Sequence, residues 1–300
     1  MRGQSTLRLV FLLALAFFTA FAQDDESAQS APRLHISILG GYAYQPLDNF
    51  NRYVDFTLNR VNYDPYFGSP TGSAEKIKGN ATIEGVLSYR LIGGLEVHGV
   101  VSQTMTSGNT SMSYYRYGTI PQDVTRNADF RVLQYGLGGG YRFLIGDDAQ
   151  LRLSGSYLRA RGTWGFEYRR STSSELESMT GDLKQTVNSW RVGVGFSVCV
   201  VGPMFFTLET EYRNLKFTNL EGMATSNYVA PASSYAHPPQ DVHVHLAEAD
   251  TYFGVRSDEL ATTIPFDPPY IWTSSWPTDF RRATVDLSGF TLKGGLTLEF

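Results

Sequence analysis

Eight charged residues of this 300-residue chain stand at alternate positions in otherwise apolar segments. They are Glu84, Glu96, Arg142, Arg152, Arg191, Glu209, Glu211 and Lys293. Around Arg191, for example, Trp190 and Val192 have the opposite parity. A period of two places such sets on opposite faces of a β-strand. We therefore predict that the eight charges share one face of a sheet and pair there, because unpaired buried ions are costly.

The elements that must position these charges are strands joined by turns of alternating length. Eight segments show the strand period, at about 34–44, 80–91, 95–105, 130–143, from 151, 190–200, 206–213 and 283–300. Short turns fall at 92–94, 146–148 and 201–203, and long connections at about 45–79, 106–129, 160–188 and 214–282. The fifth segment loses its period near Leu158, where we predict a β-bulge. A ten-stranded variant would also use 242–246.

The front of the chain reads as a secretory signal peptide over residues 1–22. Arg2 and Arg8 supply positive charge, an apolar run follows, and Ala20 and Ala22 give the small-residue cleavage pattern. The apolar run is shorter than the roughly 20 residues that a membrane helix needs. We predict cleavage after Ala22 and a flexible leader at 23–32, ahead of the main domain at 33–300.

Composition narrows the class of protein further. The 29 Gly, 18 Tyr and 19 Phe suit a strand protein with aromatic girdles and small interior side chains. The single cysteine, Cys199, excludes an internal disulfide framework. A net charge of -4 with mixed signs argues against a nucleic-acid partner.

The last ten residues carry a resemblance to a known family. Lys293, Gly295, Leu298 and Phe300 resemble the C-terminal assembly signal of bacterial outer-membrane β-barrels. The chain as a whole resembles the small OmpA/OmpX/OmpW-type barrels, without a peptidoglycan-binding domain. That resemblance implies an all-β fold, an eight-stranded antiparallel up-and-down barrel spanning the outer membrane. It also implies periplasmic termini, extracellular long loops, and periplasmic chaperones and the barrel-assembly machinery as partners.

In a barrel of this kind, one face of each strand contacts lipid and the other lines the interior. A charge facing hydrocarbon costs several kcal/mol, so the apolar set should face membrane lipids and lipopolysaccharide, and the eight charges should face the interior. An eight-stranded barrel is only just wide enough for its own side chains. The interior is therefore predicted to be a packed polar core, with a narrow or gated pore as the alternative.

Within the first long connection, residues 48–61 have helical rather than strand spacing. Phe50, Tyr53, Val54, Leu58 and Val61 recur at helical spacing, and Asp48 is a plausible N-cap. We predict an amphipathic helix that caps the loops or the barrel mouth. A plug, or part of a ligand site, is the alternative.

The last long connection holds a weak candidate for a metal site. His243 and His245 alternate on a possible strand, with Glu248 and Asp250 nearby as further ligands. Such short patterns occur often by chance, so a solvated hairpin is the preferred interpretation. No metal and no other cofactor are predicted.

An enzyme is the least favoured function. His98 with Ser88 or Ser102 is the best available pair for nucleophilic chemistry, and no complete Ser-His-acid set can be assembled. The sequence predicts a structural, adhesive or surface-recognition protein whose external loops meet a protein or glycan partner. A channel for small solutes is the alternative, and a lipid-modifying barrel enzyme is the third hypothesis.

Overall fold

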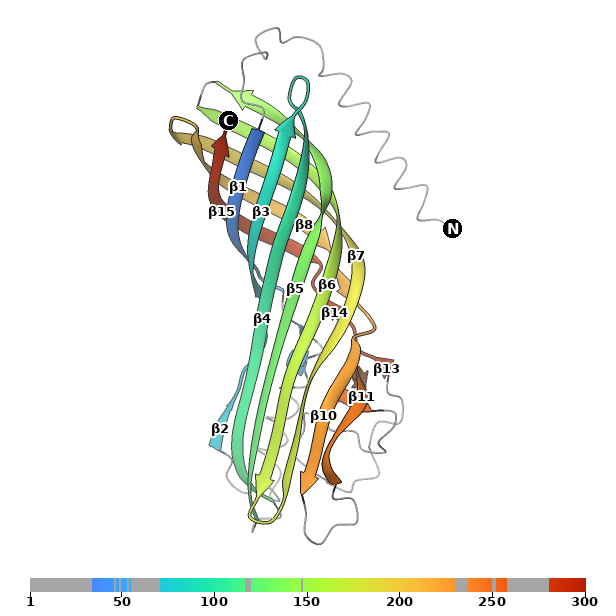
Figure 1. Cartoon of the computed structure of the whole chain (residues 1–300). Coiled ribbons are helices and arrows are strands. Elements are labelled where there is room, and N and C mark those ends of the chain that lie inside the picture. Colours follow the sequence, from blue (N-terminus) through green and yellow to red (C-terminus); the bar gives the residue numbers. More distant parts are fainter. Residues whose placement is uncertain are drawn as a thin grey trace.

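The computed structural model describes residues 34–45, 47, 48, 50–52, 54, 71–116, 120–146, 148–229, 237–249, 252–257 and 281–300. The predicted signal peptide and leader lie outside these residues. The fold is all-β (Figure 1). Its strands are β1 (Leu34–Ala43), β2 (Thr71–Ala74), β3 (Asn80–Arg90), β4 (Leu95–Arg116), β5 (Ile120–Ile145), β6 (Ala149–Thr172), β7 (Leu176–Val201), β8 (Met204–Asn214), β9 (Lys216–Phe217), β10 (Glu221–Val229), β11 (His237–Ala249), β12 (Tyr252–Ser257), β13 (Arg281–Arg282), β14 (Val285–Asp286) and β15 (Gly289–Glu299).

Eight of these strands close into a ring. Antiparallel pairing runs in the order β1, β3, β4, β5, β6, β7, β8 and β15, and β15 pairs with β1 again. The first and last strands meet in a regular register, from His35 opposite Glu299 to Tyr42 opposite Leu292. A closed ring leaves no strand edge open to another chain. This arrangement is compatible with the predicted barrel, but the sheet as a whole is larger than eight strands.

The additional sheet grows from one side of the ring. Strands β4 to β7 contain 22, 26, 24 and 26 residues, whereas β1, β3, β8 and β15 contain 10 or 11. Beyond Met105, Leu133, Tyr157 and Trp190 the four long strands continue together. β2 pairs with β4 and β10 pairs with β7, while β11 pairs with β10, β12 and β13. We call this second part the extension. It points away from the end of the ring that holds the C-terminus (Figure 1).

The predicted loops at about 106–129 and 160–188 are therefore mostly wrong, because both segments continue the strands. On β6 the apolar residues move from odd positions, Leu153 and Tyr157, to even positions, Leu158 and Ala160. The apolar period of the sequence breaks there, yet β5 and β6 stay in register from Gln122 opposite Thr172 to Ile145 opposite Ala149. The predicted bulge at Leu158 is wrong for the same reason. The environment of the side chains changes, and the backbone does not.

Other predicted boundaries also shift. The connection at 214–282 contains β9 to β13, and the last long strand begins at Gly289 rather than near 283. Residues 242–246 lie in β11, which pairs with β10 and β12 and takes no part in the ring. β10, β11 and β12 follow one another as hairpins, and the pairing of β10 with β7 attaches them to the long strands, which the strand period of a single segment does not encode.

The extension has an apolar core on its inner face. It contains Leu47, Phe50, Val54, Ile77, Met112, Val124, Ala128, Phe130, Val132, Ala160, Trp164, Phe166, Tyr168, Met179, Leu183, Leu215, Phe217, Leu220, Ala224, Val242, Val244, Leu246, Ala283, Val285 and Leu287. The rings of Trp164 and Phe50 have centroids 6.2 Å apart, and those of Phe130 and Phe217 5.3 Å apart. Each large apolar side chain buried here contributes about 1.5–3 kcal/mol. The extension is thus packed like a water-soluble domain.

The predicted helix is present in part. Asp48, Phe50, Asn51, Arg52 and Val54 are helical, while residues 55–61 lie outside the described part of the chain. Phe50 and Val54 enter the apolar core. The side chain of Asn51 anchors the helix by donating to Ile77 O at 2.7 Å and accepting from Ile77 N at 2.8 Å. The segment therefore caps the core of the extension. In the part of the chain that the structure describes, no helix is long and apolar enough to cross a membrane.

Candidate functional site

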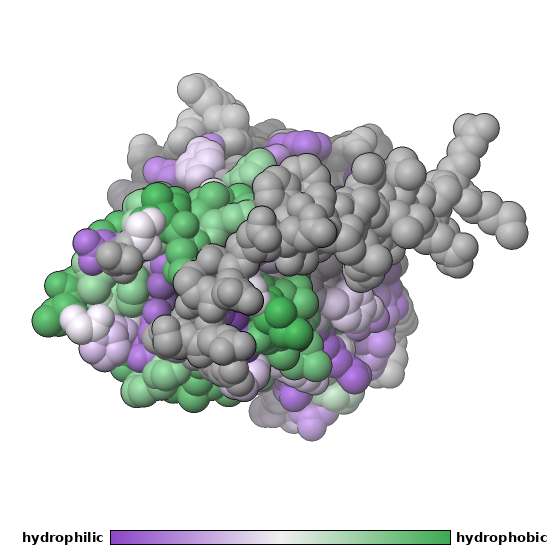
Figure 2. Space-filling view, turned by 90° about the horizontal axis from the view of Figure 1, so that it is seen from above, coloured by the Kyte–Doolittle hydropathy of each residue, from purple (hydrophilic) through white to green (hydrophobic). Residues whose placement is uncertain are grey.

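The outer surface of the ring is apolar. Its exposed residues include Ile38 (64% exposed), Leu137 (74%), Val192, Val194, Phe196, Phe206, Leu208, Leu292, Leu296 and Leu298. Figure 2 shows hydrophobic side chains gathered on the outer flank at the ring end of the molecule. Contiguous apolar patches of this extent are rare on proteins whose whole surface meets water. Such a surface is typical of a region that contacts a membrane or another protein.

The interior of the ring has the opposite character, and all eight charges singled out by the sequence point into it. Seven of them are buried, and the side chain of Arg152 is 11% exposed. Alternation along β3, β4, β5, β6, β7, β8 and β15 places them there, because the opposite parity of each strand carries the exposed apolar residues. They fall into two clusters.

One cluster lies towards the extension and joins Glu84, Arg191, Glu211 and Lys293. Lys293 Nζ lies 2.7 Å from a carboxylate oxygen of Glu84 and 2.7 Å from one of Glu211. Arg191 Nη1 donates to Glu211 at 2.8 Å, and its guanidinium also pairs with Glu84. Two cations and two carboxylates thus satisfy one another across β3, β7, β8 and β15.

The other cluster joins Glu96, Arg142, Arg152 and Glu209. Arg142 pairs with Glu96 at 3.1 Å and with Glu299 at 2.8 Å, while Arg152 pairs with Glu96 and lies 3.4 Å from Glu209. Carboxylate oxygens of Glu84, Glu209 and Glu211 approach within 4.8 Å of one another. Arg152, Arg191 and Lys293 already neutralise these oxygens, which makes the group an ion-pair network rather than a cation site.

A ladder of hydroxyl groups crosses the same interior. Ser37 lies 2.8 Å from Thr297, Thr297 2.8 Å from Thr207, and Thr207 2.9 Å from Ser197, measured between side-chain oxygens. These residues sit on β1, β15, β8 and β7. Hydroxyls can donate and accept at once, so the ladder satisfies a polar surface without charge.

The end of the ring nearest the extension is closed by Arg213 and an apolar layer. Arg213 is 1% exposed and donates to Leu287 O at 3.0 Å, Thr104 Oγ1 at 3.1 Å, Gln45 Oε1 at 3.0 Å and Asn80 Oδ1 at 2.9 Å. Directly beyond it, the apolar core includes Leu215, Phe217, Val285 and Leu287. The segments before β15 and after β8 therefore cover the polar interior.

Arg213 and Glu299 belong to the interior network but not to the eight charges selected from the sequence. Arg213 shares its parity with Glu209 and Glu211 on β8, and Glu299 shares its parity with Lys293 on β15. Strand parity alone places both on the interior face. Their individual partners could not have been found in this way, because each reaches across the ring to other strands.

His98 is not arranged as a general base. Its Nε2 lies 2.8 Å from Ser156 Oγ, and its Nδ1 lies 3.1 Å from Arg152 Nη2. Arginine can only donate, so Nδ1 accepts and Nε2 carries the proton. His98 therefore donates to Ser156 and cannot remove its proton in this arrangement. The predicted partners differ from the observed one: Ser88 lies across the strand pair from His98, and Ser102 donates to Gln134.

The weak metal candidates His243 and His245 lie on β11. Glu248 has the opposite parity on that strand and pairs with Arg281 at 2.9 Å, while Asp250 lies outside the described residues. Among the residues that the structure describes, neither histidine belongs to a group of three potential metal ligands. The strand places the two histidines on one face without bringing Glu248 to them.

The four residues of the predicted assembly signal divide between the two faces of β15. Lys293 is buried in the ring, whereas Leu298 and Phe300 are exposed, at 39% and 62%. Gly295 faces inward, where a Cβ would lie 2.0 Å from Ile38 O, so only glycine fits against β1 without a shift. The four residues therefore share a strand but not a surface.

Comparisons with known proteins identify no family for this chain. A scan against models of known families finds no match, and a search of curated proteins finds none either.

Proposed function

We propose that this chain is an integral outer-membrane β-barrel whose ring spans the bilayer and whose extension stands outside the cell as a rigid recognition platform. The observation that carries the proposal is the reversal of side-chain exposure within four continuous strands. Towards the ring, β4 to β7 expose apolar residues and bury polar ones, and beyond Met105, Leu133, Tyr157 and Trp190 the order is reversed. Hydrocarbon around the ring would explain its exposed apolar residues, and water around the extension would explain its exposed polar residues.

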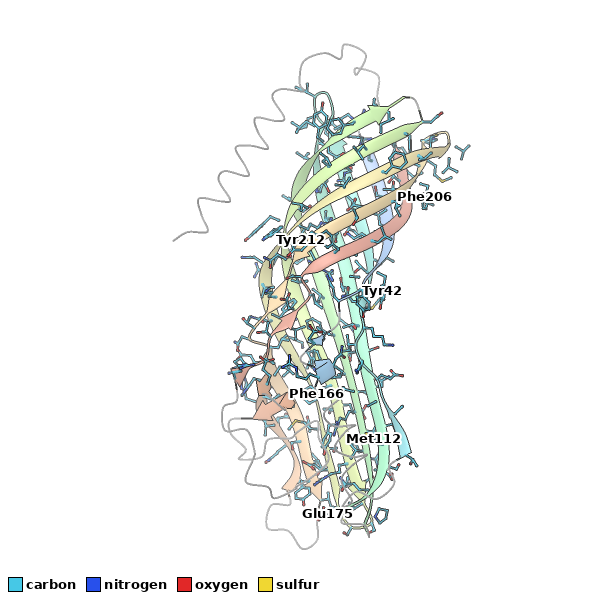
Figure 3. The ribbon with its side chains drawn as sticks, turned by 180° about the vertical axis from the view of Figure 1, so that it is seen from behind. Tyr42, Met112, Phe166, Glu175, Phe206 and Tyr212 are labelled. Carbon is cyan, nitrogen blue, oxygen red and sulfur yellow. The ribbon has the colours of Figure 1, made fainter. Side chains whose placement is uncertain are left out.

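Aromatic residues support the same placement. Tyr42, Tyr44, Trp190, Tyr212 and Phe290 lie around the end of the ring nearest the extension, and Trp190, Tyr212 and Phe290 form a chain of ring contacts at 5.8 and 5.2 Å. Tyr141 and Phe143, 4.6 Å apart, lie near the opposite end, as does Phe206. Figure 3 shows Tyr42 and Tyr212 between the level of Phe206 and the extension. Two aromatic belts are typical of a barrel that crosses a membrane.

The rigidity of the extension and the closed interior of the ring support the recognition role. The ring interior is filled by ion pairs and covered by an apolar layer, which favours a structural or recognition protein over an open channel. The extension carries its own core and holds its strands in fixed register. A binding surface built on paired strands loses less conformational entropy on binding than a flexible loop does.

Orientation in the membrane can be tested by cysteine labelling, because the chain has a single cysteine. In a Cys199→Ser background, Thr125→Cys puts a thiol on the exposed face of the extension. Asp148→Cys puts one on the exposed turn that follows the same strand, β5. We expect a membrane-impermeant maleimide to label T125C in intact cells and to label D148C only after the outer membrane is opened.

The two variants control for each other, since both thiols are exposed and close to opposite ends of β5. Equal labelling of both in intact cells, or of D148C alone, would contradict the proposed orientation. Recovery of the protein in the soluble fraction would contradict membrane insertion itself.

Current measurements in planar bilayers distinguish the structural role from the channel hypothesis. Because ion pairs and the apolar layer close the interior, the refolded chain should give no steady single-channel current. A steady current that grows when residues 48–61 are deleted would replace the structural role with a plugged pore.

A further inference from the structure

The charges just beyond the apolar belt of the ring are sorted by sign. On the outer face of β5, β6 and β7, the first charged residues after the belt are Arg131, Arg159, Arg161 and Lys184. We call these four residues the boundary patch. No acidic residue faces outward among them on these three strands.

The strand register fixes how the patch is arranged. Three successive rows across the strands read Tyr135–Arg159–Asn188, Leu133–Arg161–Thr186 and Arg131–Thr163–Lys184. Arg159 and Arg161 are two residues apart on one strand, so their Cα atoms lie about 7 Å apart. Arg131 is the diagonal neighbour of Arg161, at about 7–8 Å. The cations therefore form one compact group beside exposed tyrosine and leucine side chains.

The next two rows contain the opposite charge. They read Asp129–Gly165–Asp182 and Asn127–Glu167–Thr180. The carboxylates of Asp129 and Asp182 already pair with Arg131 at 2.8 Å and Lys184 at 3.7 Å. Arg159 and Arg161 are exposed and have no ion-pair partner among the described residues. Within the described part of the chain these two guanidiniums are therefore available to an anion.

We infer that the boundary patch binds a phosphorylated glycolipid of the outer leaflet, with the lipid phosphates on Arg159 and Arg161 and its acyl chains on the apolar belt below. The inference rests on the proposed membrane-spanning function. Leu133, Tyr135 and Tyr157 supply exposed apolar surface beside the two arginines. Guanidinium groups bind phosphate oxygens through paired, charge-assisted hydrogen bonds. Farther out, the exposed carboxylate of Glu167 has no ion-pair partner among the described residues and repels a phosphate, which limits the height of the headgroup.

The test uses the full mature chain in nanodiscs and counts retained lipid by native mass spectrometry. The probes are a diphosphorylated lipid A and the same lipid with its phosphates removed. We expect the unmodified chain to retain the phosphorylated lipid. The double variant Arg159→Gln and Arg161→Gln should retain about tenfold less at the same lipid concentration, since two charge-assisted contacts are lost.

Arg169→Gln provides the matched control. Arg169 is exposed on the same face of the same strand, but it lies beyond the acidic rows. The R169Q variant should retain the lipid as well as the unmodified chain does. If R169Q lost as much lipid as the double variant, the effect would come from non-specific charge and the inference would be overturned. Retention of as much lipid by the R159Q/R161Q variant as by the unmodified chain would also overturn it.

Two further measurements in the same experiment identify the ligand and separate this inference from the proposed function. Equal retention of the dephosphorylated lipid would overturn a phosphate site. Displacement of the lipid by millimolar inorganic phosphate would overturn the lipid as its specific occupant and assign a soluble anion instead. Failure of the chain to insert into nanodiscs would contradict the membrane-spanning function, whereas insertion with unselective retention would overturn the lipid site alone.

Discussion

In the ring, β6 exposes Leu153 and Tyr157 and partly or fully buries Ser154 and Ser156. Farther along the same strand, in the extension, it exposes Arg161 and buries large apolar side chains such as Trp164. Strands β4, β5 and β7 make the same exchange. A strand can therefore keep its backbone alternation while its apolar residues move from the outer to the inner face. The surrounding medium and the packing partners decide which parity is apolar.

The largest expected effect removes the central side chain of the extension core. Trp164→Ala should cost about 3–5 kcal/mol of the extension's stability, because Trp164 is fully buried against Phe50 and Phe130. The ring contains none of these contacts and should stay folded. Pulse proteolysis in urea, read as cleavage within the extension, would measure the loss. Simultaneous unfolding of the ring would break the division into two regions.

The matching change in the ring interior removes a cation. Lys293→Met leaves Glu84 and Glu211 with Arg191 as their shared partner. The expected cost is about 3 kcal/mol, near the lower limit for breaking a buried pair, because Arg191 still compensates both carboxylates in part. Urea unfolding in lipid vesicles would measure it. If the K293M variant were more stable than the unmodified chain, the ring interior would tolerate apolar packing of the kind found in the extension core.

Exposed apolar residues of the two regions should respond differently to the same substitution. Leu137 in the ring and Met223 in the extension are 74% and 55% exposed. Leu137→Arg should destabilise the vesicle-embedded protein by about 2–4 kcal/mol if the residue lies at the bilayer midplane. Met223→Arg should change stability by no more than about 0.5 kcal/mol. Similar losses of stability in the two variants would contradict the proposal that the ring and the extension lie in different media.

The smallest effect concerns the exposed ion pair between Lys216 and Asp286, which joins β9 to β14 at 2.8 Å. Partial burial raises the pKa of Asp286, but hydrogen bonds from Lys216 and Ser288 outweigh burial and hold that pKa below its usual value. A depressed carboxyl pKa contributes stability above the unfolded-state pKa, and this contribution is lost as pH falls through the folded-state pKa. Asp286→Asn should therefore lower the melting temperature by about 1–2 °C at neutral pH. Scans at decreasing pH should show the difference disappear in acid, and an unchanged difference would exclude this ion pair as its cause.

Sequence reasoning located the ring strands because their apolar faces alternate against charged or small residues over ten or more positions. The continuation of β4 to β7 could not be predicted in this way, because a change of the apolar residues to the opposite parity, as at Leu158, Ala160 and Trp164, indicates the end of a strand. The eight interior charges could be selected by parity alone. Their partners could not, since Arg142 reaches Glu299 across 157 positions of sequence. Part of β11 was visible as the possible strand at 242–246, but its place outside the ring was not, since that depends on the pairing of β10 with β7.

The uninterrupted register of β5, β6 and β7 also has a mechanical consequence. The turn between β6 and β7, near Glu175, lies at the far tip of the extension (Figure 3), and both strands continue from it into the ring without a hinge. A load applied at that tip along the strand axes acts in shear on a long series of backbone hydrogen bonds, which share it instead of opening one at a time. The extension therefore transmits tension directly to the ring, as a stiff beam fixed at one end.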